Sequence, residues 1–572
     1  MVTRGVKPVQ VHSARSNDMR LIKKMNRHLL ASCCVLAALM LMTGCSKVTT
    51  STGSAGNGNP WTVHGHLRWA GVAEPDNMNP LLGEQQIEVD LSMFWGGYLF
   101  NWSDDNKFVP ELATDAPTSK NGGISADGLA ITYHLRKGVK WQDGAPFSAD
   151  DVIFTWHAVM NPANNVQTRL GYDLVDTIDK KDDYTIIVHL KKRWAPFVNS
   201  FFTMSSTPYC ILPKHLLGQY PDINHVPFNN LPVGTGPFKV VEYQKGTIIR
   251  MVANPNYWRG APKLQEVDYK IIPDETTILT QLRTHEVDME YNAPASQTPS
   301  YKDITGVHIY LTPFTHYRQI GLNTTNPILH DVRVRQALAF GIDQQELINT
   351  VSHGVDMEGD SDQPPFLWAY SKNVKRYPHD PAAAAKLLDD AGWKLGSDGY
   401  RYRNGQKLEL GMSGATGAAE TRNLEAIVQR EWQQIGVQGD IKNYATPLFF
   451  ASMQAGGILQ GGKFDTAFYS WINGIDPDDS TLFMCDQFPP NGQNSYHFCD
   501  NDLDAAENVA MTEYDQDKRK AAYDKVQQIL TEQEPLIIIW YVRRQDIINS
   551  DLRNYKPAHA VTTFWNTWEW EL

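Results

Sequence analysis

The amino-acid sequence predicts an α/β protein of several domains, and three observations support this class. Residues 127–156 show an alternation of apolar and polar residues, then turn dipeptides, then apolar residues at helical spacing. Residues 536–541 form a continuous apolar run, which is typical of a strand buried on both faces of a sheet. A chain of 572 residues is long enough for several domains with sizeable apolar cores.

The N-terminal region has the pattern of an export signal. Basic residues precede an apolar run at 29–42, which is too short to span a bilayer comfortably. The run ends in Thr43-Gly44-Cys45, which resembles a bacterial lipobox, in which the cysteine is lipidated and becomes the mature N-terminus. We therefore expect a signal peptide at 1–45, a lipid anchor on Cys45 and a flexible Ser/Thr/Gly/Asn-rich linker at 46–61.

The body that follows alternates predicted strands and helices. In 127–156, Ser148 stands three residues before Asp151, which is a capping-box pattern at a helix start, and Asn161-Pro162 ends the helix. Asp331, Asp343 and Asp380 are further N-cap candidates. Strands are predicted at 65–70, 184–190, 238–242, 247–252, 267–272, 437–443 and 464–475, and helices at 91–100, 278–283, 380–393, 421–435 and 515–533.

Three cysteines remain after removal of the predicted leader. In an oxidising compartment, Cys485 and Cys499 would form a disulfide closing a loop of about 15 residues, which stabilises a fold by roughly 3 kcal/mol. Cys210 would then be an unpaired, buried thiol. No CxxC spacing for a metal or redox site is present in the sequence.

Composition and motifs argue against several function classes. The formal net charge of −12 is spread along the chain, whereas nucleic-acid binding requires a clustered basic face. The sequence has no G-x-S-x-G or HExxH motif, and Gly234-Thr235-Gly236 lacks the Lys-Ser/Thr of a phosphate-binding loop. The pair His64 and His66 beside a linker is weak support for a metal site. We therefore expect no enzyme activity, no metal, no cofactor and no nucleic-acid partner.

Three blocks carry a family resemblance: LRKGVKWQDGAPFSADDVIFTW in 127–156, VGTGPFKVVEYQKG onward in 233–289, and DVRVRQALAFGIDQQELI at 331–348. They resemble the bacterial extracellular solute-binding proteins of family 5, which serve peptide and nickel ABC importers. The resemblance implies a periplasmic-binding-protein type II fold, with two lobes, a hinge and an extra third domain (cluster C). It implies lobe I at 62–101, 233–320 and 546–572, the extra domain at 102–232, and lobe II at 321–545.

The resemblance also implies where a ligand binds. Trp471 resembles a tryptophan that lies in the cleft of relatives, and a nearby Asp in those relatives pairs with the ligand's α-ammonium. Asn473-Gly474 stand where that Asp is expected, so two alternatives remain open: Asp476 binds an ammonium, or Asn473 binds a neutral group. The other candidate ligand contacts are Glu84, Gln85, Tyr98 and Tyr317.

The implied function is a monomeric, membrane-anchored substrate-binding lipoprotein, exported to the periplasm or cell surface. It would capture short peptides between the lobes and deliver them to an ABC permease with its ATPase subunits. Nickel chelates and oligosaccharides are alternative ligands. From other classes, a secreted hydrolase and a peptide-sensing lipoprotein without a permease remain alternatives.

Overall fold

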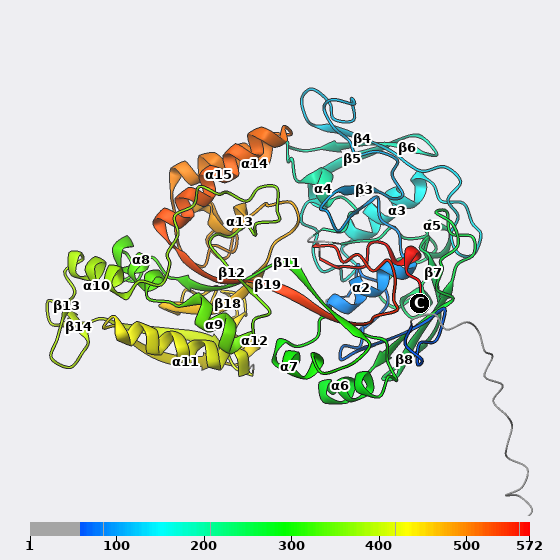
Figure 1. Cartoon of the computed structure of the whole chain (residues 1–572). Helices are drawn as coiled ribbons and strands as arrows, with labels where there is room; N and C mark the ends of the chain where they lie inside the picture. Colours follow the sequence, from blue (N-terminus) through cyan, green and yellow to red (C-terminus); the bar gives the residue numbers. More distant parts are fainter. Residues whose placement is uncertain (1–57, 84, 206–207, 418, 560) are drawn as a thin grey trace, which may run out of the picture. The chain divides into compact units, whose positions relative to one another are not determined.

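The structure is a computed structural model that describes residues 58–572 except 84, 206–207, 418 and 560 (Figure 1). The predicted leader with Cys45, most of the predicted linker and the candidate contact Glu84 lie outside the described residues. Among the helices that are described, none is both long enough and apolar enough to cross a membrane.

One sheet of 11 strands runs through the body of the protein. Its strand order is β17-β16-β18-β11-β19-β10-β1-β9-β8-β7, and β12 pairs with β19. On the lobe I side the strands are β1 (His66–Gly71), β7 (Phe238–Gln244), β8 (Ile248–Ala253), β9 (Glu266–Ile271) and β10 (Met289–Glu290). On the lobe II side they are β12 (Met357–Glu358), β16 (Glu409–Ala415), β17 (Gln438–Tyr444) and β18 (Thr466–Ile472).

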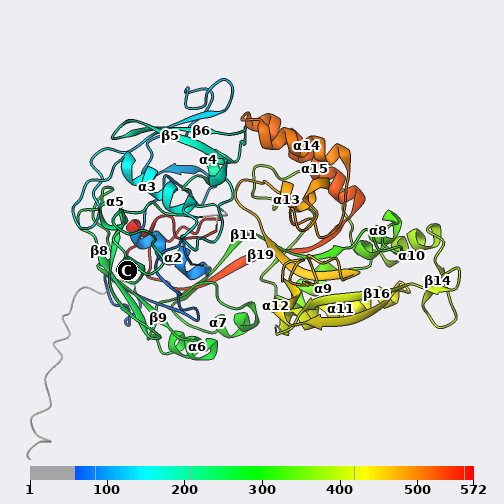
Figure 2. The same ribbon diagram turned by 180° about the vertical axis from the view of Figure 1, so that it is seen from behind.

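Two long antiparallel strands, β11 (Val307–Leu322) and β19 (Leu536–Asn549), connect the two sides (Figures 1 and 2). Their ladder is irregular between Pro313 and Tyr317, which pair with Arg543 and Tyr541. Three residues of β11 thus oppose one residue of β19, and such a bulge bends the strand. The bulge lies in one of the two strands that connect the lobes. The predicted lobe boundaries at 320/321 and 545/546 lie within the same two strands.

The extra domain is inserted between β1 and its parallel neighbour β9. It holds an antiparallel sheet of β4 (Ala130–His134), β6 (Thr185–Leu190) and β5 (Val175–Asp182), and a pair of β2 (Phe100–Trp102) and β3 (Phe108–Pro110). Its helices are α3 (Ala149–Met160), α4 (Phe197–Ser200) and α5 (Lys214–Leu217). The predicted unit at 127–156 is confirmed: Ser148 caps α3, with Asp151 completing the capping box.

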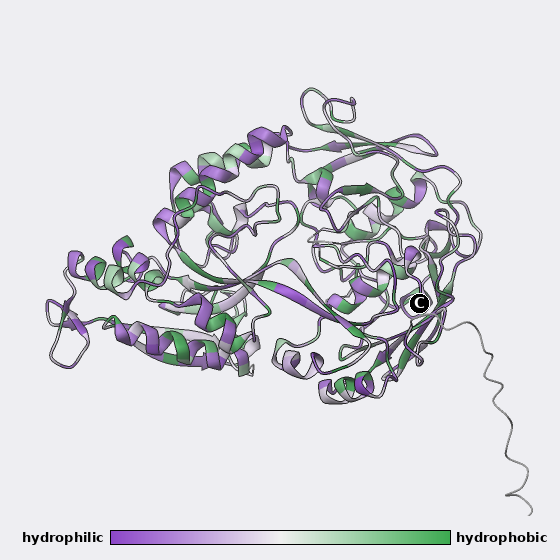
Figure 3. Ribbon diagram, viewed as in Figure 1, coloured by the Kyte–Doolittle hydropathy of each residue, from purple (hydrophilic) through white to green (hydrophobic). Residues whose placement is uncertain are grey.

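Helices cover the lobes with amphipathic faces. In lobe I these are α2 (Gln86–Trp95), α6 (Glu275–Arg283) and α7 (Thr298–Tyr301). In lobe II they are α8 (Val332–Phe340), α9 (Gln344–Val351), α10 (Pro381–Asp390), α11 (Ala419–Gln434), α12 (Thr446–Phe449), α13 (Ser480–Phe483), α14 (Asn501–Thr512) and α15 (Gln516–Gln533). A small sheet of β13 (Lys394–Leu395), β14 (Arg401–Arg403) and β15 (Gln406–Lys407) follows α10. Figure 3 shows the alternating polar and apolar stripes of α11, whose Leu424, Val428 and Trp432 are buried.

The helix predicted at 91–100 is shifted in the structure. The helix α2 begins at Gln86 and ends at Trp95, because Gly96-Gly97 terminates it and Phe100 begins β2. The predicted turn around Gly234 packs directly on this helix end: a Cβ at Gly234 would lie 1.7 Å from the Trp95 carbonyl oxygen. Only glycine permits this approach, so the glycines at 234 and 236 serve close backbone packing.

Candidate functional site

The segment that follows β18 is hydrogen-bonded to β11 and to the loop around Asp362. Trp471 is the cross-strand partner of Tyr317 on β11. The backbone N–H of Asn473 donates to the Thr315 carbonyl at 2.7 Å, and its side-chain amide donates to the Asp362 carbonyl at 2.9 Å. Asn473 is 4% exposed. The backbone N–H of Asn473 therefore holds this segment against β11, and its side-chain amide holds it against the loop around Asp362.

Asp476 is bound by two side chains from distant parts of the chain. Arg519 on α15 donates two hydrogen bonds to its carboxylate, at 2.6 and 2.8 Å, and Asn199 on α4 donates a third at 2.7 Å. Burial alone lowers the pKa of Arg519, but the Asp476 carboxylate outweighs this effect and the pKa is raised. Both side chains are 6% exposed. The carboxylate proposed for a ligand ammonium is thus occupied by an internal cation.

Hydrogen bonds join the extra domain to lobe II along this boundary. Besides Asn199–Asp476, they are Asn106 Nδ2 to the Phe366 carbonyl (3.0 Å), the Ala195 N–H to the Met511 carbonyl (2.7 Å) and the Tyr514 hydroxyl to the Gly128 carbonyl (2.9 Å). Several segments of the extra domain are therefore hydrogen-bonded to lobe II.

A cavity of about 550 Å³ lies between these contacts. Its walls come from both bodies and include Trp102, Phe108 and Asn199 of the extra domain, and Phe366, Trp368 and Arg519 of lobe II. Small-molecule sites are commonly concave, rich in aromatic surface and placed between domains, with a few polar groups for orientation. This interdomain cavity is the candidate ligand site.

Carboxyl groups are buried beside this region. Asp362, Asp479 and Glu507 are each at most 2% exposed, and Gln363 donates to both Asp362 and Asp479. Burial raises the pKa of Glu507 to about 8 and raises those of Asp362 and Asp479 well above their usual values. These groups hold protons in the folded state at pH values where exposed carboxyl groups are ionised.

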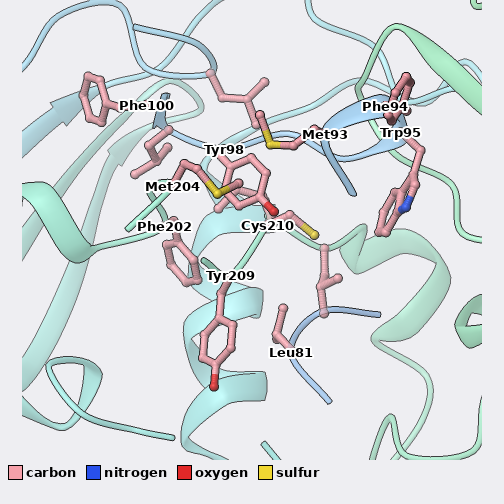
Figure 4. Close-up of a cluster of buried hydrophobic side chains, with 14 of the residues drawn as sticks. Leu81, Met93, Phe94, Trp95, Tyr98, Phe100, Phe202, Met204, Tyr209 and Cys210 are labelled. Atoms are coloured by element: carbon pink, nitrogen blue, oxygen red, sulfur yellow. The ribbon is translucent and has the colours of Figure 1, made fainter. Parts of the chain in front are cut away.

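The structure does not bring all of the predicted contacts together. Gln85 is the N-cap of α2 and forms a capping box with Glu88. Tyr98 lies in the core beside Cys210 (Figure 4), is 1% exposed, and has its hydroxyl 2.5 Å from the Ser92 hydroxyl. Among the described residues, the buried hydroxyl of Tyr317 has no hydrogen-bond partner. Tyr317 and Trp471 are cross-strand neighbours, and Tyr98 is a core residue. None of the predicted contacts that the structure describes lines the interdomain cavity; Asp476 reaches it through its partners Arg519 and Asn199.

Sequence reasoning missed several residues of the cavity. Arg519 belongs to a stretch rich in charges that is typical of a solvated helix face, so no local signal singled it out. Asn199 is likewise unmarked. The apolar triplet at 366–368, directly after Pro364-Pro365, was a usable signal, because large apolar side chains in a loop often mark a binding surface.

The sulfur atoms of Cys485 and Cys499 are joined in a disulfide, with a sequence separation of 14 and a Cα–Cα distance of 4.6 Å. The bond closes the loop that leads from α13 into α14. Cys210 is free and buried, and burial raises the pKa of its thiol.

One group of potential metal ligands occurs within the described ranges: His66, Glu266 and Asp268. The His66 imidazole lies 3.1 Å from Asp268, and Arg250 Nε lies 2.9 Å from Glu266 and 3.2 Å from Asp268. The Arg250 guanidinium thus already pairs with both carboxylates, and an ion-pair network accounts for this group without a metal ion.

Comparison with known proteins gives a consistent family assignment. The chain is 26% identical over 544 residues to the oligopeptide-binding protein AppA of Bacillus subtilis, a match covering 94% of this chain and 97% of that protein. It is 27% identical over 521 residues to the dipeptide-binding protein of Escherichia coli, covering 86% of this chain and 91% of that protein.

Solved structures show the same architecture. NikZ from Campylobacter jejuni, in complex with Ni(L-His), superposes with a TM-score of 0.71 at 26% identity, covering 89% of this chain and 100% of NikZ. The substrate-binding protein CtaP from Listeria monocytogenes superposes with a TM-score of 0.77 at 23% identity, covering 89% of this chain and 100% of CtaP. The predicted type II periplasmic-binding fold is confirmed. Residues 107–493 match the family model "Bacterial extracellular solute-binding proteins, family 5 Middle", and the chain belongs to this family of peptide and nickel ABC-transporter substrate-binding proteins.

Proposed function

We propose that this protein captures short peptides between lobe II and the body formed by lobe I and the extra domain, and delivers them to the permease of an ABC importer. The observation that carries this proposal is the aromatic-walled cavity of about 550 Å³, whose two sides belong to the extra domain and lobe II. The relatives named as oligopeptide- and dipeptide-binding proteins support peptides as the ligand class. Peptide backbone can pair with protein backbone as an added strand, which tolerates many side-chain sequences.

The bulge in β11 supports a closing motion. A ligand held by both walls binds the closed arrangement better than the open one, and this difference in affinity shifts the population toward closure. The closed form then presents both lobes to the permease, and the ATPase subunits drive import. The chain itself does no chemistry in this scheme and acts as a monomer.

The export signal and Cys45 complete the proposal. Lipidation of Cys45 with more than one acyl chain would anchor the protein stably on a membrane, and the polar linker would leave the body free to meet the permease. Mass spectrometry of the N-terminal peptide tests this: Cys45→Ser should abolish the lipid adduct and release the protein into the soluble fraction.

Native mass spectrometry of the gently purified protein, repeated after unfolding and refolding, tests the ligand class. A spread of small masses matching short peptides, lost on refolding, is the expected result. A metal adduct would instead indicate a nickel chelate, a ligand class that the similarity to NikZ favours. One discrete non-peptide mass without metal would indicate another single ligand, such as an oligosaccharide. Turnover of added peptides would instead indicate a hydrolase.

A matched pair of variants places the binding site. Phe366→Ala removes an aromatic wall of the cavity, whereas Phe450→Ala truncates a phenylalanine that is 48% exposed and lies outside it. We expect peptide affinity to fall at least tenfold in the first variant and to stay unchanged in the second. Equal affinities would place the peptide elsewhere. A refolded protein that gains no thermal stability from peptide mixtures would exclude peptide capture, since a ligand specific for the native state must stabilise it.

A further inference from the structure

A second cavity, of about 490 Å³, lies within lobe II and shares no lining residue with the interdomain cavity. It is bounded by the α8–α9 connection, by the loop at 358–378, by the end of α15 and by the start of β19. All of its lining residues belong to lobe II.

The floor of this lobe II cavity is apolar and its walls carry two tyrosines. Ala339, Ile342 and Ile538 are buried members of the lobe II core that also line the cavity. The Tyr370 hydroxyl donates to Asp360 at 2.8 Å, and the Tyr377 hydroxyl donates to the Thr531 carbonyl at 2.6 Å. Because both hydroxyls already donate hydrogen bonds within the protein, these tyrosines present mainly their aromatic rings to the cavity.

Glu534 is the unusual residue of the cavity wall. It is 5% exposed, and its carboxylate makes no hydrogen bond and no ion pair within the part of the chain that the structure describes. It has a left-handed backbone, with φ 48° and ψ 57°, a conformation that is costly for a residue with a side chain. A buried carboxylate without a partner is itself unfavourable.

The neighbouring cations do not neutralise this carboxylate directly. The Arg335 guanidinium donates to backbone carbonyls, including those of Gln533 and Glu534. The Lys375 ammonium lies 5.1 Å from the Tyr377 ring centroid and forms no ion pair within the described ranges. Burial raises the pKa of Glu534 well above its usual value, and the nearby charges of Arg335 and Lys375 offset this effect only in part.

The lining also limits the ligand chemistry. Four carboxyl residues line the cavity, Glu358, Asp360, Asp362 and Glu534, and so do the two cations Lys375 and Arg376, of which Arg376 pairs with Asp360 at 2.9 Å. Because the Glu534 carboxyl group has no such partner among the described residues, the ligand group that complements it is a cation. The group of three potential metal ligands found in the described ranges is elsewhere, at His66, which favours an organic cation over a divalent metal.

We propose that the lobe II cavity binds a small organic amine, with Glu534 as the counter-ion of its ammonium group and the apolar floor and tyrosine rings around its hydrocarbon part. This site is separate from the proposed peptide site. A ligand ammonium would supply the charge partner that Glu534 lacks, and the cavity volume accommodates an alkyl chain of several carbons.

The test is isothermal titration calorimetry of the purified protein with n-hexylamine, 1-hexanol and hexanoate. We expect hexylamine to bind at least tenfold more tightly than the alcohol, and hexanoate not to bind. Since Glu534 must ionise on pairing, binding should release a proton, and the apparent enthalpy should differ between phosphate and Tris buffers. Equal affinity for amine and alcohol, or no binding of either, would overturn the proposal.

Matched variants assign the site. Glu534→Gln keeps the side-chain shape and should weaken hexylamine at least tenfold and abolish the proton release. Glu532→Gln, two residues away on an exposed side chain, should change neither. Ala339→Leu fills the floor and provides a second variant should Glu534→Gln fold poorly; it should also reduce binding.

A control separates this site from the peptide cavity. Phe108→Ala alters only the interdomain cavity, so hexylamine affinity should be retained. Amine binding that survives Glu534→Gln but is lost in Phe108→Ala would place the amine in the peptide site and refute a lobe II site. Peptide binding should be unaffected by Glu534→Gln, so the two proposals fail independently.

Discussion

Arg519 on α15 binds both carboxylate oxygens of Asp476, at 2.6 and 2.8 Å, across 43 residues of sequence. This pair lies against the interdomain cavity, with Asn199 of the extra domain as the third partner. Removing one member of a buried ion pair leaves the other charge without compensation, at a typical cost of about 3–5 kcal/mol.

We therefore predict that Asp476→Ala lowers the free energy of unfolding by about 3 kcal/mol. Urea denaturation followed by tryptophan fluorescence measures this. The matched control is Asp390→Ala, which breaks a surface ion pair with Lys386 and should cost less than about 1 kcal/mol. The double variant Asp476→Ala/Arg519→Met should lose less than the sum of its single variants. Strict additivity would mean that the two side chains are not coupled.

The pairing of Asp476 with Arg519 also predicts how much a free amino terminus contributes to peptide affinity. Because Asp476 is engaged by Arg519, it is not free to bind an α-ammonium, and N-acetylated peptides should bind within about threefold of the corresponding free peptides. Competition between a free and an acetylated tetrapeptide of equal sequence, read by calorimetry, measures the ratio. A loss of a hundredfold or more on acetylation would show that a carboxylate does recognise the ammonium.

The contrast between Ser148 and Asp476 shows what sequence could predict. The Ser148–Asp151 capping box spans three residues, so its pattern is visible in the sequence and the helix start was predicted correctly. Asp476 finds its partners 43 and 277 residues away, and nothing local in the sequence marks Arg519 or Asn199 as its neighbours. Alternation likewise placed strands correctly, but it could not distinguish Tyr98 in the core from a residue in the cleft.

Buried carboxyl groups predict a dependence of stability on pH. The pKa of Glu507 is about 8 in the folded protein, because burial disfavours its charge and Asp478 and Asp362 add repulsion, which the interactions with Asp479 and Arg519 offset only in part. In the unfolded chain the pKa of a glutamate is about 4.3. Between these values the unfolded state loses its proton first, so the stabilising contribution is complete below about pH 4 and is lost as pH rises toward 8.

The melting temperature should accordingly fall between pH 5 and pH 9. Glu507→Gln removes the titrating group and should flatten this fall, whereas Glu532→Gln, which is exposed, should leave it unchanged. Differential scanning calorimetry at matched ionic strength measures both. A melting temperature that rises over this range would contradict the assignment.

The disulfide between Cys485 and Cys499 gives a further prediction. Cross-links of this loop length stabilise by roughly 3 kcal/mol, mainly by restricting the unfolded chain. The double variant Cys485→Ala/Cys499→Ala should show this loss in urea denaturation, and dithiothreitol should no longer affect its unfolding midpoint. Cys210→Ala is the control, and its midpoint should still respond to the reductant.

Glu534 should illustrate a conflict between stability and binding. Its left-handed backbone costs about 1 kcal/mol or more with a side chain present, and glycine adopts this conformation freely. Glu534→Gly also removes a buried, unpaired carboxyl group. We therefore predict that the variant gains about 1 kcal/mol of stability in urea denaturation while losing hexylamine binding.

If the carboxylate instead pairs with Lys375 in solution, Glu534→Gly should lose stability, and Lys375→Met should destabilise the parent protein but not the Glu534→Gly variant. A gain in stability together with a loss of binding would mean that the residue is kept for the ligand, at the expense of the fold.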